Sequence, residues 1–221
     1  MDLSKSFEYF DPASVNGKCH IIGCGSVGST IAENLARLGI TQFVLYDFDT
    51  VEPHNLANQM FVNADVKKPK VEATKKIITD INPEAENDIE IFPEGYTGQK
   101  LNGYVFLCVD NIDLRREICE KNKMNQAIKV VFDCRTALES AQLYAAEWGD
   151  LKQVKNLLKT MEFTHEEAAA ATPTTACGRT LGVAPTVRMV CCLAVTNFMN
   201  YVLGKGIKPM IVCDPFRMEI Y

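Results

Sequence analysis

Short apolar runs alternate with amphipathic stretches through the first two-thirds of this chain. The apolar runs predict strands at 19–22, 42–46, 89–92, 104–109 and 129–132. Apolar residues at helical spacing predict helices at 29–38, 70–81 and 112–126. Strands that alternate with helices are typical of a parallel sheet joined by crossover helices. The pattern therefore predicts an α/β fold with a doubly wound sheet.

The pattern changes after about residue 142. It predicts a strand at 143–146, a charged and alanine-rich segment at 150–171, a long apolar helix within 181–203, and closing strands at 210–213 and 218–221. We expect these elements to form a mixed or antiparallel C-terminal extension of the parallel sheet. Arg188, Asn197 and Asn200 interrupt the long apolar stretch, which favours a buried amphipathic helix over a membrane span. The length of 221 residues, 47% of them hydrophobic, suits one domain over 1–221 with a single large core.

Charge and cysteine content narrow the choice of function. The net charge of −5 argues against a nucleic-acid-binding surface. The nine cysteines are an odd number without any Cys-x-x-Cys pair, so we expect no structural zinc and mostly buried, reduced thiols. The first ten residues are polar and acidic and do not resemble a signal peptide. We therefore predict a cytoplasmic protein without a membrane partner.

A glycine-rich loop is the first candidate for chemistry. Gly23, Gly25 and Gly28 follow the first apolar strand and precede a helix, which is the Rossmann-like arrangement that brings a helix N-terminus to a phosphate. Asp47 ends the second strand, at the interval expected for a carboxylate that binds a ribose. Asp49 is a further nucleotide-binding candidate, or else a solvated turn carboxylate. Together these residues predict a nucleotide site without identifying the nucleotide.

Further motifs give the chain a resemblance to one family. The stretch from 21 to 111 contains "LYDFDTVEPHNLANQ", "KKPKVEA", "DINPEAE" and "LCVDN", with Arg115 shortly after. In order and spacing these motifs resemble the ThiF/MoeB/HesA family of adenylating enzymes, which are related to ubiquitin activators. The run "HNLANQ" is similar to that of short phage- and plasmid-borne members. The resemblance continues more faintly through "FDCRTALESAQLY" and "IVCDPFRMEI".

The resemblance implies a role for each matching residue. Asp47 corresponds to the ribose-binding acid, and Asn55 and Gln59 to residues on the phosphate side of the pocket. Lys70 corresponds to the lysine that reaches the triphosphate of ATP, and Asp110 to the acid that positions Mg²⁺. These roles agree with the chemistry, because adenylation develops negative charge that a lysine, a metal ion and a helix N-terminus can stabilise.

Two of these residues also have plainer interpretations. Asp110 ends an apolar strand at the edge where α/β proteins bind ligands, but it could instead cap the helix that follows it. Lys70 could be an exposed lysine in a first helical turn. His54 lies within a motif, yet a structural role in a loop is the simpler interpretation.

One residue departs from the family pattern. Asn58 stands where the family usually has arginine, and no arginine precedes Arg37. Removing one preorganised donor typically costs about 3–4 kcal/mol of transition-state stabilisation. The chain is then a slow enzyme, uses Arg115, Arg116 or Arg135 instead, or only binds nucleotide.

Cys177 lies in a segment that resembles the crossover segment of relatives, some of which capture the activated acyl group on a sulfur there. We expect 150–176 to be a mobile part of this crossover. Arg179 would make the Cys177 thiol electropositive and more acidic, whereas an ordinary cysteine at a helix entry is the alternative. We expect the other eight cysteines to be buried and unreactive.

The main hypothesis is an ATP- and Mg²⁺-dependent adenylyltransferase. By resemblance it would be a homodimer that activates the C-terminal carboxylate of a ubiquitin-like or sulfur-carrier protein ending in glycines. The alternative is a nucleotide-binding pseudoenzyme or partner-binding module, weakened by Asn58. A third hypothesis, a dinucleotide-dependent oxidoreductase, fits the glycine loop and Asp47 but leaves Lys70 unexplained.

Overall fold

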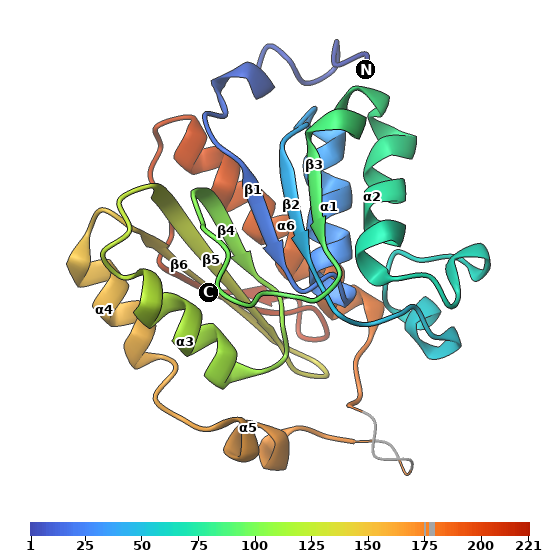
Figure 1. The fold of residues 1–221 in the computed structure, drawn as a ribbon. Coiled ribbons are helices and arrows are strands. Elements are labelled where there is room, and N and C mark those ends of the chain that lie inside the picture. The colour runs from blue at the N-terminus through green and yellow to red at the C-terminus, as the bar shows by residue number, and fades with distance from the viewer. Residues whose placement is uncertain (175, 177–179) are drawn as a thin grey trace.

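The computed structural model describes residues 1–174, 176 and 180–221. Its centre is an eight-stranded sheet in the order β3-β2-β1-β4-β5-β6-β7-β8 (Figure 1). The first five strands in this order pair in parallel, and each pair from β5 to β8 is antiparallel. This arrangement confirms the predicted doubly wound parallel sheet with an antiparallel C-terminal extension.

The strands are β1 (Cys19–Ile22), β2 (Phe43–Tyr46), β3 (Ile89–Phe92), β4 (Gly103–Leu107), β5 (Ile128–Thr136), β6 (Ala141–Glu147), β7 (Met210–Asp214) and β8 (Glu219–Ile220). The α-helices are α1 (Ser26–Arg37), α2 (Lys70–Ile81), α3 (Ile112–Asn122), α4 (Leu151–Lys159), α5 (His165–Ala171) and α6 (Ala184–Val202). Short 3₁₀ helices lie at η1 (Pro12–Ser14), η2 (Pro53–Ala57), η3 (Asn63–Asp65) and η4 (Pro83–Asp88).

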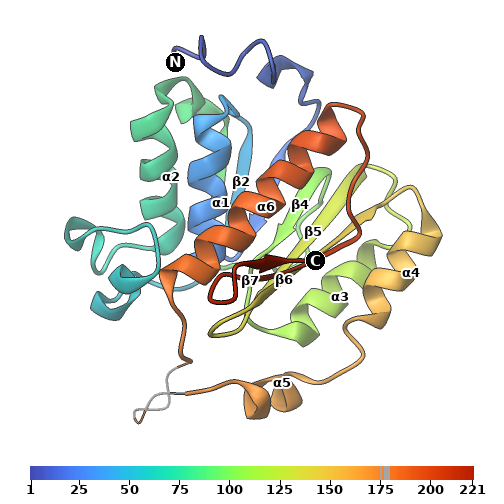
Figure 2. The same cartoon turned by 180° about the vertical axis from the view of Figure 1, so that it is seen from behind.

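The helices cover both faces of the sheet. Figure 2 shows α1, α2 and α6 on one face, and Figure 1 shows α3 and α4 on the other. The larger core lies under the first group, with Ile31, Phe106 and Phe198 fully buried in it. The second core, around Val105 and Trp148, lies under α3 and α4. Because the central strands are buried on both sides, they read as continuous apolar runs in the sequence.

Several element boundaries differ from the sequence prediction. Helix α1 begins at Ser26, three residues before the predicted start, because Gly25 acts as its N-cap. Helix α3 ends at Asn122 rather than 126, where Asn125 turns the chain by donating its side-chain amide to the Leu101 carbonyl. Strand β5 extends to Thr136, since it pairs with β6 from Val130 to Thr136.

The segment from 150 to 171 forms two helices, α4 and α5, at the start of the crossover. The Asp150 side chain caps α4, and Thr164 caps α5. Whether 150–176 moves as predicted stays a prediction. Helix α6 begins at Ala184 instead of 181, with Pro185 in its first turn, a position that suits proline. Within the described residues, no helix is both long and apolar enough to span a membrane.

Candidate nucleotide site at the sheet edge

The glycine loop and Asp110 lie at the switch point of the sheet. Strands β1 and β4 are parallel neighbours in the sheet. Strands β2 and β3, which come between them in the sequence, lie on the other side of β1. Ligands of α/β proteins bind at such a switch point, beyond the carboxyl ends of the strands. The loop contacts β4 closely, because a Cβ on Gly23 would lie 2.8 Å from the Cys108 carbonyl carbon and Gly23 has a φ of +94°.

The N-terminus of α1 opens at this edge. Its N-cap is Gly25, which has no side chain that could cap the first backbone N–H groups. A Cβ placed on Gly25 would have no atom within 4 Å. A Cβ at Gly28 would lie 1.8 Å from the Gly23 carbonyl oxygen, so glycine is required where the helix packs on the loop. The first turn therefore presents backbone N–H groups and the positive end of the helix dipole to open space, which suits an anion.

Asp47 connects β2 to the glycine loop. Its Oδ2 accepts a hydrogen bond of 2.7 Å from the Cys24 N–H, and its Oδ1 accepts one of 2.8 Å from the Asp49 N–H. Burial raises the pKa of Asp47 above its ordinary value, although both N–H donors oppose the shift. Each carboxylate oxygen can accept a second hydrogen bond, so Asp47 retains capacity for a ribose hydroxyl.

Lys70 and Asp49 bring two separate motifs together. The Lys70 N–H donates to the Asp49 carbonyl at 2.9 Å, and the Lys70 ammonium lies 2.7 Å from Asp49 Oδ2. Backbone bonds between Val51 and both Lys67 and Lys68 align the same two segments. Only 9% of the Lys70 side chain is exposed, so Lys70 is not the exposed lysine of the plainer interpretation. Asp49 is exposed, but it is ion-paired.

The segment after Glu52 approaches the first turn of α1. The Met60 N–H donates to Ser29 Oγ at 3.2 Å, which places the neighbouring Gln59 beside that turn. The Gln59 side-chain oxygen is buried and has no hydrogen-bond partner. An orphaned buried acceptor is costly. An N–H or O–H group of a bound ligand would satisfy this oxygen, and the Gln59 amide nitrogen is a donor that could bind a phosphate oxygen at the α1 N-terminus.

The other residues of this segment differ in their surroundings. Asn55 is buried, and its side-chain oxygen accepts a 2.9 Å bond from the Glu52 N–H, which folds η2. Asn58 is half-buried, with its side-chain nitrogen 3.3 Å from where a Gly182 Cβ would lie. His54 lies in η2, 3.1 Å from the Glu52 carboxylate with its imidazole 41% exposed, which favours the structural interpretation.

Asp110 lies just beyond β4 with an exposed side chain. The N-cap of α3 is not Asp110 but Asn111, whose side-chain oxygen accepts a 3.0 Å bond from the Leu114 N–H. Among the described residues, the Asp110 carboxylate makes no hydrogen bond or ion pair. A carboxylate with both oxygens available is a suitable ligand for Mg²⁺, which prefers oxygen.

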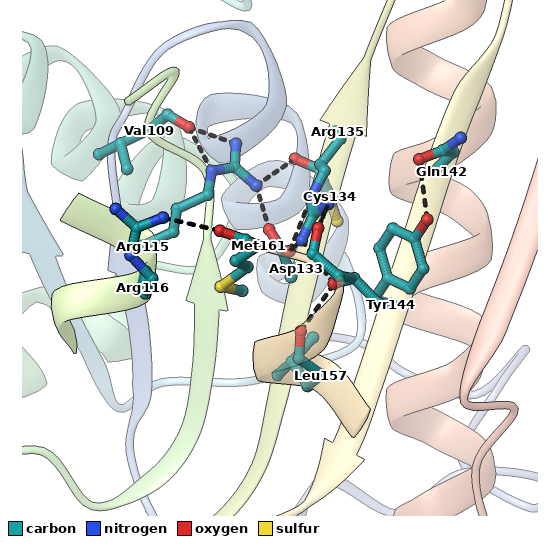
Figure 3. A network of polar contacts seen from close by, with 11 residues as sticks. Val109, Arg115, Arg116, Asp133, Cys134, Arg135, Gln142, Tyr144, Leu157 and Met161 are labelled. Atoms are coloured by element: carbon teal, nitrogen blue, oxygen red, sulfur yellow. Dashed lines mark hydrogen bonds and ion pairs between the residues drawn. The ribbon is translucent and has the colours of Figure 1, made fainter. Parts of the chain in front are cut away.

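The three arginines that could replace the missing family arginine are already engaged. Arg115 and Arg135 both pair with Asp133, which is fully buried. Arg116 donates to the Met161 carbonyl at 2.8 Å (Figure 3). It also donates to the Phe163 carbonyl at 3.1 Å and pairs with Asp113. These bonds make them poor substitutes for a catalytic arginine at Asn58.

Asp133 was not among the residues singled out by sequence. The sequence did contain a sign of its role, because Asp133 directly follows the apolar run Val130-Val131-Phe132. A carboxylate buried at the end of such a strand must be paired.

The cysteines were predicted only in part. Cys177 lies outside the described residues. Burial raises the pKa of seven thiols, those of Cys19, Cys24, Cys108, Cys119, Cys134, Cys191 and Cys213. The expectation that all eight others are buried is wrong for Cys192, which is exposed on α6 beside the buried Cys191, because adjacent positions of a helix face different directions.

Two cavities lie away from this edge. One of about 310 Å³ is lined by Pro12, Gly39 and Gln42, among others, and one of about 260 Å³ lies over His20, Tyr46 and Phe92. Neither is lined by a predicted nucleotide-binding residue.

Comparisons with known proteins agree with this architecture. The chain is 28% identical over 148 residues to ubiquitin-like modifier-activating enzyme 5 of Culex quinquefasciatus, and 30% identical over 144 residues to that of Drosophila mojavensis. Each alignment covers 57% of this chain and 35% of the relative, so the match extends over about a third of the length of these relatives.

Solved structures extend the likeness to almost the whole chain. E. coli MccB with ATP has a TM-score of 0.72 at 18% identity, covering 95% of this chain and 64% of that chain. PaaA has a TM-score of 0.66 at 19% identity, with 95% of this chain covered and 64% of that one. These similarities show a shared fold. The ThiF family model matches residues 14–219, and the chain therefore belongs to the ThiF family.

Proposed function

We propose that this chain binds ATP at the edge between β1 and β4 and adenylates the C-terminal carboxylate of a small protein. The observation that carries this proposal is the meeting of three separate sequence motifs at one switch point. The α1 N-terminus, the Asp49–Lys70 pair and the Asp110 carboxylate all lie at or beside this edge. A dinucleotide-dependent oxidoreductase would not require a buried lysine at this position.

The proposed reaction joins a carboxylate to the α-phosphorus of ATP. A carboxylate oxygen of the partner attacks the α-phosphorus, the bond from that phosphorus to the bridging oxygen breaks, and pyrophosphate leaves with the electron pair. The α1 N–H groups, Lys70 and Gln59 would donate to the phosphate oxygens, and Asp47 would accept from a ribose hydroxyl. Asp49 contributes by holding Lys70, and Asn55 by folding the segment that carries Asn58 and Gln59.

Asp110 would hold Mg²⁺ at the same edge. When bound, this ion neutralises charge on the triphosphate and on the departing pyrophosphate. The unpaired carboxylate fits that role. Its position relative to a bound nucleotide would depend on the conformation of the turn from β4 to α3.

The relatives support the choice of partner. Some are named as activating enzymes for ubiquitin-like modifiers, and MccB has been crystallised with the peptide MccA. We propose a partner of this general class, a ubiquitin-like or sulfur-carrier protein with a glycine-rich C-terminus. We also propose that the enzyme is a cytoplasmic homodimer and that 150–176 is a mobile crossover segment. Cys177 would then take the acyl group from the adenylate as a thioester, with release of AMP.

A binding module with weakened catalysis is the second candidate. Three arginines support this alternative, because their guanidinium groups already donate to backbone carbonyls and do not replace the missing arginine. These are Arg115, Arg116 and Arg135. Asn58 still provides a neutral donor, which is weaker than a charged one.

Nucleotide titration followed by pyrophosphate–ATP exchange separates these functions. Calorimetric titration should show ATP binding and no tight NADH binding, and the reverse would overturn the proposed class. Exchange by the native chain that Asp110→Ala abolishes supports the enzyme. Binding without exchange, together with exchange gained by Asn58→Arg, supports the binding module.

A further inference from the structure

Arg115 closes the turn between β4 and α3. Its Nε donates to the Val109 carbonyl at 2.7 Å, and its Nη2 donates to the same oxygen. Its Nη1 donates to the Cys134 carbonyl at 2.8 Å and to the Asp133 carboxylate. Figure 3 shows the guanidinium between these groups. Four N–H donors of one side chain therefore fix its orientation.

Asp133 holds Arg115 in this position from β5. Its Oδ1 accepts from Arg115, while its Oδ2 accepts from Arg135 Nε at 2.8 Å and Nη2 at 2.6 Å. Arg135 in turn donates to the Thr160 carbonyl at 2.7 Å and to its hydroxyl at 2.8 Å. Because Asp133 is fully buried, its charge requires these partners.

The Val109 carbonyl belongs to the peptide bond that joins Val109 to Asp110. A peptide unit is planar. The hydrogen bonds from Arg115 to this oxygen therefore fix the plane that contains the Asp110 nitrogen and Cα. The Asp110 side chain itself is exposed and makes no bond among the described residues. The backbone therefore sets where the Asp110 side chain begins and the direction of its Cα–Cβ bond, and Arg115 is the side chain that holds that backbone.

We propose that Arg115, held by Asp133, is a positioning residue that orients Asp110 for Mg²⁺. The inference rests on the proposed function, which assigns the metal to Asp110. Groups that orient metal ligands without touching the metal commonly change its affinity about 10–100-fold when they are altered. A purely structural ion cluster would affect folding stability instead and leave the metal dependence of nucleotide binding unchanged.

The test compares ATP affinity with Mg²⁺ and with EDTA, measured by calorimetry on the full chain. The ratio of the two affinities is the magnesium gain. Arg115→Lys keeps the positive charge beside Asp133 but loses the pair of hydrogen bonds from Nε and Nη2 to the Val109 carbonyl. Arg116→Lys is the matched control, because it makes the same change at the next residue of α3, whose guanidinium contacts Met161 and Phe163 instead.

We expect Asp110→Asn and Arg115→Lys each to lower the magnesium gain about tenfold, and Arg115→Lys to leave the ATP affinity in EDTA unchanged. Arg116→Lys should retain the full gain. The double variant of Asp110 and Arg115 should lose no more than Asp110→Asn alone, because the two residues act as one unit. Thermal melting is measured on every variant. If Arg115→Lys does not fold, Arg115→Gln takes its place, since it leaves Asp133 in a neutral pair with Arg135.

Three outcomes would overturn the positioning role alone: a full magnesium gain in Arg115→Lys, an equal loss of ATP affinity with and without the metal, or additive losses in the double variant. If Asp110→Asn keeps the full gain, the metal role of Asp110 is wrong and the positioning role falls with it. If the native chain does not bind ATP, the proposed function itself is wrong.

Discussion

The ammonium of Lys70 lies 2.7 Å from the Asp49 carboxylate, with the lysine nearly buried and the aspartate half exposed. A nearly buried ammonium requires a counter-charge, and here the chain supplies its own. A triphosphate at the α1 N-terminus would compete with Asp49 for the same ammonium. We therefore predict that nucleotide binding exchanges one anionic partner of Lys70 for another.

This exchange makes Asp49→Asn informative. The variant leaves the Lys70 ammonium with a neutral partner, so the free protein should lose about 1–2 kcal/mol of unfolding free energy. ATP should raise the melting temperature of the variant more than that of the native chain, because it restores the missing charge. Thermal melting with and without ATP measures both effects, with Lys70→Met as the control in which the ATP effect is lost. A smaller ATP effect in Asp49→Asn would contradict the exchange.

We predict that Asn58 limits the rate of the proposed adenylation. Asn58→Arg restores a charged donor, and pyrophosphate–ATP exchange should rise by up to about 10²–10³-fold, the usual value of one such donor. Asn58→Gln is the matched control, since it lengthens the side chain without adding charge. Equal rates for native, Arg and Gln forms would show that position 58 does not face the reacting phosphates.

The sequence predicted those parts of the site that depend on local order along the chain. The glycine loop, Lys70 at the start of α2 and Asp110 at the end of β4 follow from strand and helix patterns, and the structure places them at or beside one edge. The choice of Asn111 over Asp110 as the α3 cap was not predictable, because both residues are good caps and one position separates them.

Long-range charge pairing was the least predictable feature. Asp133 lies 18 residues from Arg115 along the chain, and nothing in the spacing says which of the nearby arginines it faces. Only the pairing of β4 with β5, and the packing of α3 on them, determines that Arg115 reaches both Val109 and Asp133. The solvent-facing position of Cys192 similarly required the orientation of α6 on the sheet.

His20 should make stability depend on pH. It is 1% exposed, its Nδ1 lies 3.0 Å from the Tyr46 hydroxyl, and its Nε2 accepts a 3.3 Å bond from the Asn102 N–H. Burial lowers the pKa of His20 from 6.5 to about 4. Between pH 6.5 and about pH 4, His20 is therefore mostly protonated in the unfolded chain and mostly neutral in the folded chain. The free energy of unfolding consequently falls as the pH falls through this range.

The expected size is about 2 kcal/mol between pH 7 and pH 5. Urea unfolding of the native chain and of His20→Gln at both pH values isolates this contribution, because the other titrating groups are shared. The variant should lose about 2 kcal/mol less than the native chain over the same interval. Parallel pH dependence of the two proteins would show that His20 is protonated in the folded state at pH 5.

Thiol labelling tests the proposed acyl acceptor. We expect Cys177 to react fastest with iodoacetamide, the exposed Cys192 next, and the seven cysteines of raised pKa slowest. Peptide mapping by mass spectrometry gives the order. Cys177→Ala should retain ATP binding and lose any reductant-sensitive conjugate with the partner protein, whereas Cys192→Ala should keep both. A conjugate that persists in Cys177→Ala would end the proposed mechanism at the adenylate.

The proposed adenylation of a protein C-terminus is reversible in the presence of pyrophosphate, and pyrophosphate–ATP exchange therefore measures this step itself. The reaction contains the native chain, ATP, Mg²⁺ and a diglycine-ended carrier, with the same carrier amidated at its C-terminus as the control. We predict exchange that requires the free carboxylate and disappears in Asp110→Ala. Measurable ATP binding without exchange for every diglycine-ended carrier, or equal exchange with the amidated form, would contradict the claim.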